Sequence, residues 1–199
     1  MNGNQNFPKQ NIVANSVPYE DSDAVKKIAR SLINVLPTQK TVVIACIGTD
    51  RSTGDSLGPL VGSFLVKKLQ SPFFVYGTLD EPIHAVNLQE KLDEINARHT
   101  NAFIIAVDAC LGRLKNVGTV QINEGPLKPG AGVNKNLPEI GDIHITGIVN
   151  VSGFMEFFVL QNTRLSLVMK MAQTIADSIY FSSQTLTRQK SLSQMNWSL

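Results

Sequence analysis

The sequence predicts a three-layer α/β/α domain with a mostly parallel sheet, because short apolar runs alternate along the chain with amphipathic ones. Residues 42–47, VVIACI, form a continuous apolar run that is too short for a helix and typical of a strand covered on both faces. A polar loop containing Gly48 and Gly54 follows, and apolar residues then recur at helical spacing over residues 57–69. A strand, a loop and a helix in this order open a βαβ unit, whose loop is where such sheets bind ligands.

The composition indicates one globular domain without a nucleic-acid or membrane partner. The chain has 199 residues, of which 43% are hydrophobic and 17% charged. A net charge of +2 without a lysine or arginine cluster gives no basic surface for nucleic acid. No apolar run is long enough to span a bilayer, and no signal peptide is expected. Cys46 and Cys110 lie in apolar, strand-like surroundings, which favours reduced thiols over a disulfide and therefore a cytoplasmic location.

The first part of the chain is predicted as an arm followed by a helix and the βαβ start. Residues 1–19, rich in Asn and Gln, are expected to be irregular. Helical spacing of apolar residues predicts a helix from Asp21 or Ser22 to Pro37. A strand over residues 41–47 and a helix over residues 56–69 follow.

The middle of the chain is expected to supply three more strands. Residues 73–77 form a short strand, and Asn87 with Glu90 resembles a capping box that begins the next helix. Residues 102–107 form a buried strand that ends at Asp108, and residues 118–122 form a more polar one. The following segment, residues 125–141, is a long loop of the kind that usually has a binding role.

The last part is expected to complete the sheet and its helical cover. Residues 143–149 are predicted as the fifth strand, and a helical region from Ser152 is predicted to break near Asn162. Residues 184–199 are rich in Ser and Gln and are expected to be a tail, either frayed or docked by Leu192 and Trp197. The predicted domain therefore covers residues 20–183.

Two aspartates are expected to converge at one edge of this sheet. If the strand order is of the 2-1-3 type, strands 41–47 and 102–107 are neighbours, and the ligand site lies at their carboxyl ends. Asp55 follows the first strand and Asp108 ends the second. Two carboxylates around one water can act as base and acid in hydrolysis, because their repulsion separates their pKa values. The alternative is structural: Asp55 caps the helix that starts at Ser56, and Asp108 closes a turn.

Several other polar or flexible residues are candidates to bind substrate. Asp50 and Arg51 belong to the same loop as Asp55 and either line the site or pair with each other in solvent. His84 follows the second strand and is placed at the rim of the site. Gly130 and Gly132 either bring backbone donors to a substrate carbonyl or form a tight turn.

Three other chemistries are not favoured. Cys110 is two residues from Asp108, but no histidine is placed as its base, so a cysteine peptidase is not expected. His144 is expected to be a core or face residue of its strand rather than a ligand. The loop before Ser56 is not a phosphate-binding P-loop, because Asp55 follows Gly54 where that motif has lysine.

Three segments resemble a known family. GTDRSTGDSLGP (residues 48–59), AVDACLGR (residues 106–113) and PLKPGAGVNKN (residues 126–136) resemble the YyaC-type sporulation proteins. These are similar to the spore germination protease and, more distantly, to the hydrogenase maturation peptidases. The resemblance implies a phosphorylase/hydrolase-like α/β fold and a peptidase ancestry, with Asp55 and Asp108 at the positions of the germination protease's proposed catalytic aspartates. It also implies a protein or peptide substrate, such as small acid-soluble spore proteins, and a cytoplasmic setting in the spore or sporulating cell.

The chain departs from the hydrogenase maturation peptidases at one ligand. Those peptidases have a later histidine as third metal ligand, whereas the loop over residues 125–141 contains Lys128 and Asn134 but no histidine. Two carboxylates alone are a poor transition-metal site, so a metal-free mechanism without a cofactor is favoured. The leading hypothesis is a peptidase of sporulation or germination. The alternatives are a non-catalytic binding or regulatory module and a small-molecule hydrolase, and self-association is left open.

Overall fold

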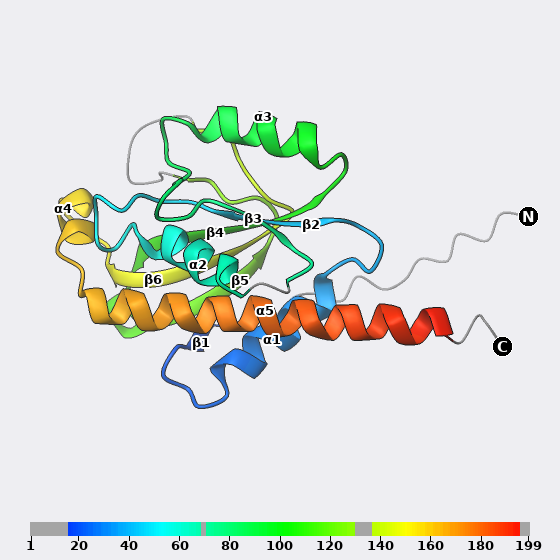
Figure 1. Cartoon of the computed structure of the whole chain (residues 1–199). Coiled ribbons are helices and arrows are strands. Elements are labelled where there is room, and N and C mark those ends of the chain that lie inside the picture. Colours follow the sequence, from blue (N-terminus) through cyan, green and yellow to red (C-terminus); the bar gives the residue numbers. More distant parts are fainter. Residues whose placement is uncertain (1–15, 69–70, 130–136, 196–199) are drawn as a thin grey trace, which may run out of the picture.

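The computed structural model describes residues 16–68, 71–129 and 137–195, which form a six-stranded sheet between helices (Figure 1). The strand order is β1-β5-β6-β4-β2-β3. The pairs β2–β3, β2–β4 and β4–β6 are parallel, whereas β5 pairs antiparallel with both β6 and β1. The strands are β1 (Val17–Pro18), β2 (Val42–Cys46), β3 (Phe74–Tyr76), β4 (Phe103–Gly112), β5 (Thr119–Glu124) and β6 (Ile143–Val151).

The helices cover both faces of the sheet and give three layers (Figure 1). Helices α1, α2 and α5 pack on one face, and α3 packs on the other. A short 3₁₀ helix, η1 (Leu114–Asn116), joins β4 to β5. The predicted α/β/α class with a mostly parallel sheet is therefore confirmed. The α-helices are α1 (Ala24–Val35), α2 (Leu57–Val66), α3 (Leu88–Arg98), α4 (Glu156–Gln161) and α5 (Leu165–Met195).

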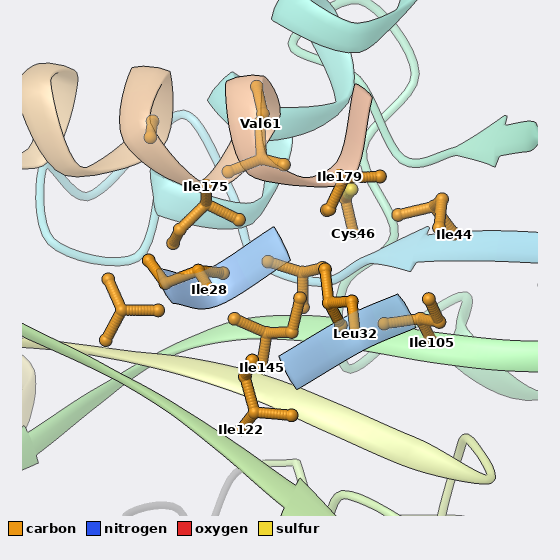
Figure 2. Close-up of a cluster of buried hydrophobic side chains, with 14 of the residues drawn as sticks. Ile28, Leu32, Ile44, Cys46, Val61, Ile105, Ile122, Ile145, Ile175 and Ile179 are labelled. Atoms are coloured by element: carbon orange, nitrogen blue, oxygen red, sulfur yellow. The ribbon is translucent and has the colours of Figure 1, made fainter. Parts of the chain in front are cut away.

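The larger core lies between the sheet and the layer of α1, α2 and α5 (Figure 2). Side chains such as Ile28 of α1, Ile145 of β6 and Ile175 of α5 are fully buried there. Burying each such side chain contributes about 1.5–3 kcal/mol. All five residues of β2 are buried, and alternate ones face this core and the smaller core under α3. This explains the continuous apolar run of its sequence.

The order β3-β2-β4 is the predicted 2-1-3 arrangement. Because β2 and β4 are parallel neighbours, with Cys46 opposite Val107, their carboxyl ends lie at the same edge of the sheet. Helix α2 approaches that edge very closely. A Cβ on Gly58 would lie 2.1 Å from the carbonyl oxygen of Ile47, and one on Gly62 would lie 1.9 Å from that of Gly77. Only glycine allows this approach, which fixes the start of α2.

Strand β4 is longer than predicted. It continues to Gly112, because β6 pairs with it as far as Gly112 opposite Val151, beyond the end of β2. The expectation that Asp108 ends its strand was therefore wrong: Asp108 lies inside β4, and neither ends the strand nor closes a turn.

The two ends of the domain also differ from the prediction. Val17 and Pro18 form an edge strand against β5, so the last part of the predicted irregular arm, residues 1–19, belongs to the sheet. Helix α5 continues to Met195, so residues 184–195 are helical rather than an irregular tail. Its hydroxyl side chains donate to main-chain carbonyls of the preceding turn, as Ser182 does to Ile179 at 2.7 Å and Thr187 to Ser183 at 3.0 Å. The expected docking by Leu192 and Trp197 concerns side chains outside the described part. No helix in the described residues is long and apolar enough to cross a membrane.

Two expectations about helix ends had different outcomes. The predicted break near Asn162 is confirmed, because α4 ends there and α5 begins at Leu165. The predicted helix start at Asn87 is confirmed, because Asn87 is the N-cap residue of α3, but the predicted capping box is not formed. Asn87 makes no side-chain cap to α3; its Oδ1 accepts from the His84 backbone at 2.8 Å and its Nδ2 donates to the Pro82 carbonyl at 3.0 Å.

Candidate active site at the carboxyl ends of β2 and β4

Asp108 lies in β4 at the point where β2 ends. The residue before it, Val107, is opposite Cys46, and the Ile47 backbone N–H donates to the Val107 carbonyl at 2.7 Å. On the other side, Asp108 is opposite Thr146 of β6. Asp108 is only 9% exposed, and its Oδ1 accepts a hydrogen bond from the Ala109 N–H at 2.8 Å. The strands on both sides therefore hold this carboxyl in a buried position.

Asp55 reaches the same edge through a loop that folds back onto the end of β2. The Thr49 backbone N–H donates to the Asp55 carbonyl at 3.2 Å. Gly48 has a φ of +140°, and a Cβ there would lie 1.9 Å from that carbonyl oxygen. The N-cap position of α2 is Ser56, without a side-chain cap bond, so the alternative in which Asp55 caps α2 does not hold.

The loop that carries Asp55 is also fixed from the side of α4. The Gly54 backbone N–H donates to the Leu160 carbonyl at 2.8 Å, and a Cβ on Gly54 would lie 2.9 Å from the Thr163 hydroxyl oxygen. Thr163 in turn accepts from the Asn150 side-chain amide at 3.2 Å. The buried Ser52 hydroxyl in this loop has no partner in the described part of the chain, and such a group is suited to hold a water.

The ionisation of Asp108 depends on the charge of Asp55. Burial raises the pKa of Asp108 well above its usual value, and the negative charge of Asp55 raises it further. The hydrogen bond from the Ala109 N–H acts in the opposite direction and lowers this pKa. Burial also raises the pKa of Asp55, opposed by the Thr49 N–H. Asp108 is buried more deeply than Asp55, and the charge of Asp55 further disfavours a second negative charge on Asp108. As the pH rises, Asp55 is therefore expected to lose its proton first. The protonated form is therefore favoured in both carboxyl groups, and more strongly in Asp108 than in Asp55.

Cys110 lies close to this pair but is a poor nucleophile. Burial and the charge of Asp108 outweigh a hydrogen bond with Thr146 and raise the pKa of the Cys110 thiol to about 11. The thiol is therefore protonated at neutral pH. Thr146 was not singled out from the sequence, because its place beside Asp108 and Cys110 depends on the pairing of β4 with β6.

The other predicted site residues are spread around the edge. His84 follows Ile83, which bridges Ile47, and its Nδ1 accepts from the Val86 N–H at 3.3 Å. Asp50 and Arg51 are exposed, and the expected ion pair between them is not found in the described structure. Gly130 and Gly132 lie outside the described residues.

A three-ligand metal site is not formed by the described residues. Over residues 16–68, 71–129 and 137–195, no group of three or more His, Cys, Asp or Glu residues is arranged to hold a metal ion. The Nδ1–H of His144 donates to the Gly125 carbonyl at 2.9 Å, as expected for a residue on the strand face. In the long loop, Lys128 pairs with Glu139 at 2.9 Å.

The α/β fold of this chain has a counterpart among solved structures. The structure is similar to the crystal structure of a NiFe hydrogenase maturation protease, HycI, from Thermococcus kodakarensis KOD1. The TM-score is 0.52 at 18% sequence identity, over 77% of this chain and 98% of that chain.

The sequence comparison assigns the family. Residues 16–178 match the family model DUF1256, described as "Protein of unknown function", and the chain belongs to this family. It is also 55% identical over 191 residues to a Bacillus subtilis (strain 168) protein described as "Uncharacterized protein YyaC", covering 95% of this chain and 93% of that protein. The resemblance to YyaC-type proteins and to the hydrogenase maturation peptidases is thereby confirmed.

Proposed function

We propose that the protein is a peptidase that hydrolyses peptide bonds with Asp55 and Asp108. The main observation is that two carboxyl groups, both with raised pKa values, interact at the carboxyl edge of β2 and β4. Open α/β sheets bind their ligands at this edge. The likeness of the fold to a maturation protease supports the same class of reaction.

The pair provides both proton transfers that amide hydrolysis needs. The ionised Asp55 takes a proton from a water molecule, whose oxygen forms a bond to the substrate carbonyl carbon. The protonated Asp108 gives its proton to the leaving nitrogen as the C–N bond breaks, which yields a carboxylic acid and an amine. Asp108 recovers its proton from Asp55, directly or through water, before the next cycle. Proton transfers of this kind contribute about 10²- to 10⁴-fold in rate.

The proposed substrate is a protein of the sporulating cell. The resemblance of residues 48–59 and 106–113 to the germination protease motifs supports a small acid-soluble spore protein as the first substrate to test. It also supports a cytoplasmic location in the spore or the sporulating cell.

A second candidate is a non-catalytic binding or regulatory module. The deep burial of Asp108, at 9% exposure, favours this alternative, because a substrate bond must reach that carboxyl for catalysis.

Cleavage by two asparagine variants tests the proposal. A purified small acid-soluble spore protein is incubated with wild-type protein, Asp55→Asn or Asp108→Asn, and the products are identified by mass spectrometry. Each variant is expected to lose about 10²- to 10⁴-fold in rate. The control is Asp23→Asn at the N-cap position of α1, where the side chain is 54% exposed, and it should cleave at the wild-type rate. Retained cleavage in either site variant, or a stable complex without turnover in the wild type, would contradict the proposal.

A further inference from the structure

Strand β3 leaves one edge of the sheet unpaired in the described structure. The strand order ends at β3, and its inner edge pairs with β2 from Phe74 to Tyr76. Its three residues, Phe74, Val75 and Tyr76, include neither a charge nor a proline. Proteins protect edge strands with charges, with proline or by keeping the strand short. β3 has only the last of these, so its outer backbone groups can pair with a short segment of another chain.

A cavity of about 270 Å³ lies along this edge. Residues 74–78 line one side, and Lys91, Glu94 and Arg98 of α3 line the other. The end of α3 is held against β3, because the Tyr76 hydroxyl is 2.8 Å from Nε2 of His99 and the Phe74 and His99 rings are 4.3 Å apart. The groove is therefore a built feature between an edge strand and a helix.

The charges around the groove are balanced, because Lys91 and Arg98 of α3 are matched by Glu94 of α3 and by Glu81. Glu94 pairs with Lys91 at 2.9 Å and with Arg98 at 3.2 Å, so both signs alternate along the groove. Such a wall provides donors and acceptors without selecting a ligand of one charge. Together with the free backbone groups of an edge strand, it is complementary to the main chain of an extended peptide.

Ile83 connects the groove to the end of β2, where the candidate active site lies. Ile83 lines the cavity, bridges Ile47 at the end of β2, and accepts a hydrogen bond from the Gly48 N–H at 2.8 Å. Because neighbouring strands lie about 4.8 Å apart, an added strand on β3 would be about 14 Å from β4. Four or five extended residues, at about 3.3 Å each, cover that distance.

We infer that this groove binds an extended segment of the polypeptide substrate as an added strand on β3. The scissile bond then lies about four or five residues from the bound segment, at Asp55 and Asp108. This inference rests on the proposed function, because it states how that site holds its substrate.

Hydrogen–deuterium exchange locates the bound segment directly. The Asp55→Asn variant is mixed with a purified small acid-soluble spore protein, so that binding is measured without cleavage. We expect amides within residues 74–78 to exchange at least about tenfold more slowly, which corresponds to about 1.4 kcal/mol. Protection confined elsewhere would overturn the inference about the groove. An example is residues 154–161, where Phe154 and Phe157 are exposed and Leu160 contacts Gly54 of the Asp55 loop.

The outcomes separate this inference from the proposed function. Cleavage by the wild type without protection of β3 overturns the inference about the groove and leaves the proposed peptidase activity in place. Protection of β3 without any cleavage by the wild type supports the groove and contradicts the peptidase. The absence of both binding and cleavage contradicts both.

A pair of matched variants provides a second test in the wild-type background. Phe74→Lys places a charge at the edge, which opposes strand addition, and should raise KM about tenfold with kcat unchanged. The matched control is Phe181→Lys on α5, which lies on the face of the sheet opposite α3. Phe181 has the same 50% exposure as Phe74, and its replacement should leave KM and kcat unchanged. Equal KM values for Phe74→Lys and the wild type would contradict the inference.

Discussion

The two aspartates of the candidate site are held by different kinds of structure. Asp108 lies within a strand that is paired on both sides, and its position is fixed by the ladder hydrogen bonds of β2, β4 and β6. Asp55 lies in a loop whose shape depends on Gly48, Gly54 and a contact with α4. The strand buries its carboxyl more deeply than the loop does. The proposed mechanism uses this difference: the deeper carboxyl keeps a proton and the shallower one gives it up.

Apart from replacing the aspartates themselves, the largest effect is expected from moving the loop while leaving the strand in place. Gly48→Ala puts a Cβ 1.9 Å from the Asp55 carbonyl oxygen, at a φ of +140°, so the loop must shift. A displacement of about 1 Å at a reacting group can cost about 10²-fold in rate. We therefore expect a loss of that order in kcat for spore-protein cleavage.

Gly125→Ala is the matched control for that variant. Gly125 also has a positive φ, +84°, but a Cβ there would meet no atom within 4 Å. It should be destabilised by backbone strain alone and should keep wild-type kcat. Equal losses of kcat in both variants would show that strain, rather than the position of Asp55, reduces the activity.

The difference between the two pKa values is expected to produce a bell-shaped pH profile. Activity should rise as Asp55 ionises and fall as Asp108 loses its proton at higher pH, by about tenfold per pH unit on each side. Both limits lie above the usual range for aspartate, because burial raises both pKa values. Initial rates of cleavage measured across the pH range test this, and a profile without an alkaline decline would contradict the role of Asp108 as the acid.

Stability should reveal the energetic cost of the buried acid. Because the pKa of Asp108 is raised in the folded state, the unfolded chain loses this proton first, and stability falls as pH rises above the usual aspartate value. Asp108→Asn cannot ionise and should be more stable at pH 7 by about 1 kcal/mol. The gain should disappear near pH 4, about the usual aspartate pKa. Urea unfolding at both pH values measures it, and a less stable variant at pH 7 would contradict the prediction.

The smallest effect is expected at the neighbouring thiol. With a pKa of about 11, Cys110 is protonated at neutral pH, so Cys110→Ala should keep kcat within about twofold. Alkylation of the wild type by iodoacetamide, followed by mass spectrometry, should be slow at pH 7. Rapid labelling at Cys110 together with loss of cleavage would point to a thiol mechanism.

The fold was predictable where local patterns determine it. The apolar run of β2, the glycine loop and the amphipathic α2 are contiguous in the sequence, so the βαβ start could be predicted. The order β3-β2-β4 was only assumed, because it depends on pairing between strands that are far apart in the chain. The end of β4 could not be predicted in this way, because its last residues are held by β6, about forty residues later. The length of α5 was also missed, because a Ser/Gln-rich composition does not reveal that serine and threonine hydroxyls bond to carbonyls of the helix itself.

For the site, the positions of Asp55 and Asp108 in the chain could be predicted, but their surroundings could not. The contact of Gly54 with Leu160 joins segments more than a hundred residues apart, and no local pattern indicates it. The burial of Asp108 depends on its two neighbouring strands, whose exact pairing the sequence does not reveal.

The pKa of Asp108 tests the account most directly. Carboxyl ¹³C chemical shifts followed by NMR over a pH titration give this value in the wild type and in Asp55→Asn. We expect Asp108 to titrate above Asp55, and its pKa to fall in Asp55→Asn while staying above the usual aspartate value, because burial is the larger cause. An Asp108 pKa that is ordinary in the wild type, or unchanged when Asp55 loses its charge, would show that the two carboxyl groups do not act as a pair.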